Sequence, residues 1–134
     1  VPEPSADEIG NMQTLMKQIG HTPFAPLHLE ELRDRLVREH GAGAAAGPED
    51  TARLIGRHHL EQAAVIAEEV GVTTPEKELL EGRPAHSVVD LARDRGCDLV
   101  AVGTRGVGAV KGLLFGSISR TISERIETSC LIVP

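Results

Sequence analysis

Residues 97–117 read CDLVAVGTRGVGAVKGLLFGS, and this stretch decides the fold. Its opening, residues 97–102, is a short aliphatic run between two glycines, which predicts a buried strand. Residues 103–116 then form a glycine-rich loop that leads directly into a helix. Strand, glycine loop and helix in this order are typical of a parallel α/β sheet that binds a ligand at the carboxyl ends of its strands.

Outward from this stretch, strands and helices alternate through the second half of the chain. Alternation of this kind predicts right-handed crossovers and a parallel sheet with helices on both faces. The predicted elements are a helix over 48–70, a strand over 74–80, a helix from Pro84 that stops at Gly96, the strand over 97–102, a helix with a core stripe of Ile118, Ile122 and Ile126, and a last strand over 129–133.

The first half has weaker patterns. Apolar residues over 5–19 follow helical spacing, with Ser5 or Asp7 as the predicted cap and Gly20 as the predicted end. Two prolines weaken a strand prediction over 21–29. A short amphipathic helix over 30–39 and a flexible connection follow, and we find no repeat and no second domain, so residues 1–134 are predicted to form a single α/β domain.

Composition excludes several classes of protein. The net charge of −6 and the absence of Trp and Tyr disfavour nucleic-acid binding, which needs a basic face or stacking platforms. No apolar run approaches the length of a membrane span. Cys97 and Cys130 stand in no metal-binding spacing and are read as small buried residues in a reducing, cytoplasmic compartment. His58 and His59 are read as part of an exposed helix face, and no metal site is predicted.

The loop has the chemistry of a phosphate site. Glycines let backbone amides approach an anion, and the free N–H groups at a helix start attract it. Arg105 and Lys111 add positive charge, and the loop contains no acidic residue. Lys111 stands where a Rossmann motif needs its third glycine, and no Walker motif occurs. The residues alone also allow plainer readings: turn glycines, solvated cations and a Ser117 that only caps the helix.

The spacing of Gly103, Gly106, Gly116 and Ser117 resembles the nucleotide-binding pattern of the universal stress protein family. The flanking sequences resemble it too: CDLVAVGTRG before the loop, KGLLFGSIS at its end and SCLIVP at the end of the chain. The likeness covers residues 48–134 well and residues 5–29 more weakly. It implies an open, five-stranded parallel sheet of the Rossmann-like, adenine nucleotide alpha hydrolase-like type, commonly dimeric through its last strand.

The resemblance also implies a ligand and a set of residues. Family members with this motif bind ATP, with Mg²⁺ or Mn²⁺ as the expected co-ligand. The phosphates are then expected on the loop glycines and the helix start, and Val102 is expected to line the adenosine pocket. The implied binding residues are Val102, Gly103, Arg105, Gly106, Gly116, Ser117 and Ile118.

The start of the chain departs from the family pattern. The family opens with a buried strand that ends in an Asp-containing turn, and here the chain begins Val-Pro-Glu-Pro-Ser, without that Asp. The first strand is therefore expected to be truncated or divergent. A cytoplasmic tail domain excised from a transporter is one origin that this departure allows.

These observations favour an adenine-nucleotide-binding regulatory module of the stress response that acts through dimerisation or a partner. The alternative is a nucleotide-free dimerisation or interaction domain, for example one that regulates an attached transporter. An enzyme that transfers phosphate or adenylate would need a second catalytic motif, which the sequence lacks, so at most slow ATP hydrolysis is expected.

Overall fold

The computed structural model describes residues 3–21, 28–41, 43, 48–104 and 116–134. These residues fall into two compact units. The sheet unit comprises residues 1–22 and 80–134, and the helical unit comprises residues 23–79. The prediction that residues 1–134 form a single domain stays a prediction.

Two parallel strands form the centre of the sheet unit. β1 (Leu99–Gly103) pairs with β2 (Ser129–Val133) in a register that places Leu99 opposite Ser129 and Gly103 opposite Val133. Both strands were predicted from their aliphatic runs, and their parallel pairing was predicted from the alternation of elements. The described residues contain these two strands, so the five-stranded sheet implied by the family resemblance stays a prediction.

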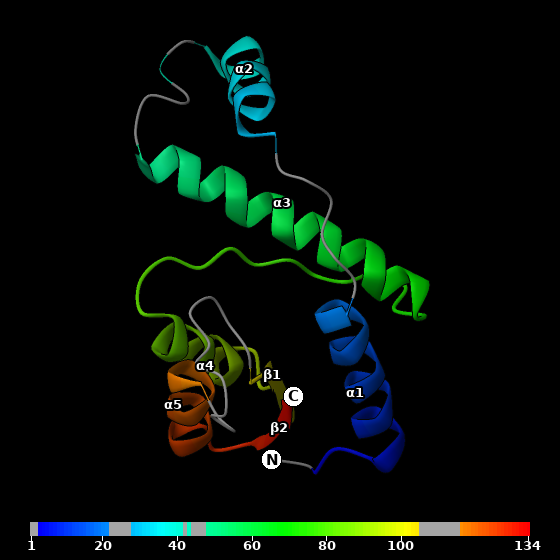
Figure 1. The fold of residues 1–134 in the computed structure, drawn as a ribbon. Helices are drawn as coiled ribbons and strands as arrows, with labels where there is room; N and C mark the ends of the chain where they lie inside the picture. The colour runs from blue at the N-terminus through cyan, green and yellow to red at the C-terminus, as the bar shows by residue number, and fades with distance from the viewer. Residues whose placement is uncertain (1–2, 22–27, 42, 44–47, 105–115) are drawn as a thin grey trace. The chain divides into compact units, whose positions relative to one another are not determined.

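Helices cover both faces of this pair of strands, as predicted. α1 (Ala6–His21) packs against β1 and β2, while α4 (Pro84–Asp94) and α5 (Ser117–Arg125) pack against each other on the other side (Figure 1). The buried residues of the unit come from α4, α5 and β2: Ala85, Ala92, Ser119, Ile122 and Val133.

The ends of these helices follow from their sequence. Ser5 caps α1 through a capping box, in which its hydroxyl accepts from the Glu8 amide (3.1 Å) and the Glu8 carboxylate accepts from the Ser5 amide (3.2 Å). The helix continues past the predicted end at Gly20 to His21. α4 stops as predicted, because Gly96 takes a left-handed φ of 62° and the Cys97 amide donates to the Ala92 carbonyl (3.0 Å).

The isoleucine stripe of α5 is only partly core. Ile122 is 1 % exposed, whereas Ile118 is 44 % exposed. Ile118 lies in the first turn, at the rim of the sheet, where the helical period alone cannot tell a buried position from an open one. The two cysteines are free and only half-buried, which corrects the prediction that both are buried.

The helical unit contains α2 (Leu29–His40) and α3 (Pro48–Glu69), both close to their predicted ranges. The Arg33 guanidinium in α2 donates to the Thr51 hydroxyl in α3 (2.6 Å). α3 ends as predicted at Gly71, whose φ is 102°. Within the described ranges no helix is long and apolar enough to cross a bilayer.

The strand predicted over 74–80 is wrong. This segment has no strand structure, and Leu79 and Leu80 are 38 % and 40 % exposed. A strand exists only when its N–H and C=O groups pair with a neighbour, and no described strand pairs with this segment. The weaker strand predicted over 21–29 falls largely on residues 22–27, outside the described ones; Leu29 begins α2.

Candidate functional site

The candidate site lies at the carboxyl end of β1, where the glycine-rich loop departs. β1 ends at Gly103, and the next amide, that of Thr104, donates to the Val133 carbonyl at the end of β2 (3.0 Å). This hydrogen bond extends the ladder by one residue and holds the start of the loop against the neighbouring strand. The loop therefore leaves from a fixed point.

The loop returns to the same point at Gly116. A Cβ built on Gly116 would lie 3.1 Å from the Thr104 carbonyl oxygen and 3.8 Å from the Ser119 hydroxyl. The nearest neighbour is backbone and cannot rotate away, so a side chain at this position would need the Thr104 carbonyl to shift by a few tenths of an ångström. The end of β1 and the start of α5 thus lie close together.

The start of α5 presents backbone donors. Its first intrahelical bond runs from the Arg120 amide to the Gly116 carbonyl (3.1 Å), so the amides of Ser117, Ile118 and Ser119 precede the helical ladder. Gly116 is the N-cap and makes no side-chain cap bond. The reading of Ser117 as the cap is therefore wrong, because Ser117 is the first helical residue.

The two hydroxyls in this turn have different surroundings. Ser119 is 2 % exposed, and its hydroxyl donates to the Gly116 carbonyl (3.0 Å). That bond fixes the turn and commits the Ser119 hydroxyl to the protein itself. Ser117 is exposed. Of the two hydroxyls, the one at Ser117 is therefore the more accessible to a ligand.

The structure brings most of the predicted residues together. Val102 and Gly103 end β1, and Gly116, Ser117 and Ile118 start α5 beside them. Arg105 and Gly106 lie outside the described residues. Thr104 was missed by sequence reasoning, although its position directly after Gly103 in the motif could have suggested a backbone role.

The described residues that flank the loop carry no charge and no metal ligand. Val102 to Thr104 and Gly116 to Ser119 provide backbone amides and hydroxyls, and no group of three His, Cys, Asp or Glu side chains in the described ranges could hold a metal ion. Backbone amides at a helix start fit an anion such as a phosphate. The described residues therefore fit the phosphate end of a nucleotide. For the nucleoside end, the motif assigns a single described residue, Val102.

Burial affects one titratable group near the sheet. Cys130 lies in β2 opposite Val100, and desolvation raises the pKa of its thiol. A raised pKa keeps the thiol neutral and unreactive. Cys130 therefore contributes packing to the strand beside the site, and no nucleophile.

Comparisons with known proteins agree with this arrangement. A sequence model of the universal stress protein family matches residues 25–134. The chain is 36 % identical over 111 residues to universal stress protein YxiE of Bacillus subtilis, covering 82 % of this chain and 64 % of that protein. It is 35 % identical over 81 residues to a universal stress protein of Thermus aquaticus, covering 58 % of this chain and 59 % of the relative. The chain thus matches less than two thirds of either relative's length.

Two solved structures share the fold. A universal stress protein crystallised in complex with cAMP has a TM-score of 0.52 at 24 % identity, covering 84 % of this chain and 90 % of that one. A universal stress protein from Archaeoglobus fulgidus has a TM-score of 0.53 at 19 % identity, covering 100 % and 89 %. With a family match over residues 25–134 and a strand–loop–helix site of the matching kind, this chain belongs to the universal stress protein family.

Proposed function

We propose that this domain binds an adenine nucleotide, with the phosphates at the start of α5, and that binding regulates its association with a partner. The observation that carries the proposal is the close approach of Gly116 to Thr104. A Cβ placed on Gly116 would lie 3.1 Å from the Thr104 carbonyl oxygen. This contact supports a closed phosphate loop, since it brings the free amides of α5 beside the carboxyl end of β1.

Electrostatics support an anionic ligand at this point. The helix start carries a partial positive charge, and the loop sequence adds Arg105 and Lys111 without any acidic residue. Mg²⁺ or Mn²⁺ bound to the phosphates would reduce the remaining charge and needs few protein ligands of its own. Family membership and the cAMP-bound relative make adenine the base to test first.

Turnover of the nucleotide is expected to be slow at most. Neither the flanking residues nor the loop sequence contains a carboxylate or an imidazole that could act as a general base for attack by water. Ser117 is the nearest exposed hydroxyl, and no described base stands beside it. Binding without rapid turnover is therefore the function that these residues favour.

Dimerisation through β2 is the proposed route of regulation. β2 pairs with β1 on one edge, and no described strand covers its other edge. An open edge of a parallel sheet offers a row of N–H and C=O groups to a second copy. The end of β2 also holds Thr104 through the Val133 carbonyl, so a partner on the other edge of β2 would lie one strand away from the start of the nucleotide loop. A transporter or other regulatory protein is a further proposed partner.

The melting temperature with and without ATP–Mg²⁺, beside AMP and cAMP, tests the proposal. A ligand that binds only the native state adds about 2.7 kcal/mol of stability at a hundredfold excess over Kd. The chain has no Trp or Tyr, so unfolding is followed by far-ultraviolet circular dichroism. A rise with an adenine nucleotide that is lost in Gly116→Val supports the phosphate loop.

A well-folded sample with no shift for any nucleotide would reject nucleotide binding. The oligomeric state measured on the same sample then decides the alternative, because a stable dimer without nucleotide binding is what an interaction domain predicts.

A further inference from the structure

A cavity lies near the amino ends of β1 and β2, where α4 and α5 end. It has a volume of about 110 Å³ and lies between the last turns of the two helices and the residues that lead into β2. α5 begins at the nucleotide loop and ends here, so the two sites occupy opposite ends of one helix. Nothing in the phosphate-loop proposal uses this cavity.

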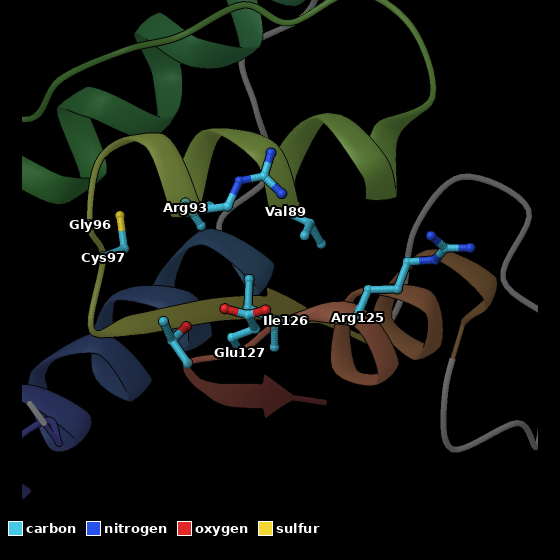
Figure 2. Close-up of a pocket in the computed structure, with 9 residues that line it drawn as sticks. Val89, Arg93, Gly96, Cys97, Arg125, Ile126 and Glu127 are labelled. Carbon is cyan, nitrogen blue, oxygen red and sulfur yellow. The ribbon is translucent and has the colours of Figure 1, made fainter. Parts of the chain in front are cut away.

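The cavity has apolar walls. Val89 and the buried Ala92 come from α4, and Ile126 comes from the residue after α5 (Figure 2). A small aliphatic group bound there would move out of water into contact with apolar side chains, which the hydrophobic effect favours.

Charged side chains of both signs line the rest of the cavity. Arg93 belongs to α4, while Arg125 ends α5 and Glu127 follows it on the way to β2 (Figure 2). Within the described residues, neither Arg125 nor Glu127 has an ion-pair partner. A cation and an anion that line one cavity without pairing leave both charges for a ligand.

Arg93 is held in place by its own helix. Its guanidinium pairs with the Asp90 carboxylate one turn earlier (2.8 Å) and approaches Asp94 (3.9 Å). A guanidinium has five N–H donors, so these pairs leave donors for a carboxylate in the cavity. The ends of α4 and α5 carry the negative poles of their helix dipoles, which favour a cationic group on the same ligand.

The wall formed by Thr128 lacks a hydrogen bond. Its hydroxyl oxygen is buried and has no partner among the described residues.

From these features we infer that the cavity binds a small zwitterion with an apolar side chain, of the α-amino acid class. The carboxylate is held by Arg93 and Arg125, the ammonium group by Glu127 and the helix ends, and the aliphatic side chain by Val89, Ala92 and Ile126. The aliphatic side chain of the ligand thus contacts the apolar residues of the cavity, and its charged groups contact the charged residues.

Titration of the full chain with L-leucine, followed by amide chemical shifts, tests the inference. Saturable shifts are expected at Val89, Cys97 and Ile126. Isocaproate, which is leucine without its ammonium group, and isoamylamine, which is leucine without its carboxylate, are each expected to bind about tenfold more weakly or worse. No nucleotide is present, so the result does not depend on the phosphate loop.

Charge-neutral variants complete the test. Arg125→Gln and Glu127→Gln are each expected to weaken leucine binding about tenfold, because each removes one charge-assisted contact from an exposed position where the fold is not at stake. Arg120→Gln and Glu124→Gln, on exposed positions of the same helix, are the matched controls and should bind as the unaltered chain does. Absence of saturable shifts, equal binding of isocaproate, or full binding by both cavity variants would overturn the inference.

Discussion

The sheet unit and the helical unit place their aliphatic residues differently. Among the described residues, the sheet unit buries Ala85, Ala92, Ile122 and Val133, whereas the helical unit buries Ile66 and Ala67. The exposed large hydrophobic residues are four in the helical unit and two in the sheet unit: Val37, Val65, Val72 and Leu79, and Leu80 and Ile118. Paired strands satisfy their own backbone and offer two faces to helices, while a helix by itself buries one stripe. Stability and ligand chemistry are therefore expected to concentrate in the sheet unit.

The sharpest test of this contrast compares Ile122→Ala with Val65→Ala. Ile122 is 1 % exposed and Val65 is 51 % exposed. Removing buried methylene and methyl groups leaves a cavity and costs about 2–5 kcal/mol, whereas truncation at an exposed position stays within about 0.5 kcal/mol. Urea unfolding followed by circular dichroism gives both free energies. Equal losses in the two variants would show that the units do not differ in packing as described.

The two tightly packed glycines, one in each unit, form the next pair. At Gly116 an added Cβ meets the Thr104 backbone oxygen (3.1 Å), and at Gly56 it meets the end of the exposed Leu79 side chain (2.5 Å). Backbone cannot yield, but a leucine rotamer can. Gly116→Ala is expected to weaken nucleotide binding about tenfold, while Gly56→Ala leaves binding intact and adds up to about 1 kcal/mol of helix stability.

Isothermal titration with ATP–Mg²⁺ measures the binding of both glycine variants, and thermal melting measures their stability. Unchanged binding in Gly116→Ala would show that the close approach to Thr104 does not matter for binding. Loss of binding in Gly56→Ala would show that the helical unit takes part in it.

The glycines that end α3 and α4 form a third pair, again with one member in each unit. Gly96 has a φ of 62°, inside the left-handed basin, and Gly71 has a φ of 102°, beyond it. Alanine in the left-handed basin costs about 1–2 kcal/mol, so Gly96→Ala should lie near the lower figure and Gly71→Ala at or above the upper one. Asparagine, which tolerates this basin, should restore most of the loss at residue 96 but little at residue 71. Thermal melting of the four variants ranks them; the reverse order would contradict the difference between the two helix ends.

The smallest expected effect is on the stability of the sheet unit at alkaline pH. Burial raises the pKa of Cys130, so the folded state keeps a proton that the unfolded chain has already lost. This stabilising contribution is complete below the ordinary thiol pKa and is lost as pH rises through the higher, folded value. Cys130→Ala should therefore flatten part of the decline in melting temperature on the alkaline side. Cys97→Ala is the control, and an equal change in both variants would assign the decline to other groups.

Much of the sheet unit could be predicted from the sequence because its signals are local. The aliphatic runs of β1 and β2, the capping serine of α1 and the left-handed Gly96 each act within a few residues. The motif also predicted which residues flank the glycine-rich loop, and their role as a binding site stays a prediction. What could not be predicted depends on distant partners: the segment over 74–80 has the pattern of a strand but no described strand to pair with. In the same way, the exposure of Ile118 and the cavity beside Arg125 depend on how helix ends meet neighbouring elements. The hydrophobic period of a helix does not say which elements lie beside its ends.

Helix α5 is only nine residues long, so its ends are about 14 Å apart. A rod this short cannot tilt at one end without displacing the other. Ligands at its two ends would therefore be thermodynamically linked: whatever factor a nucleotide imposes on the affinity for the second ligand, the second ligand must impose on the nucleotide. The affinity of the domain for either ligand would then depend on the concentration of the other.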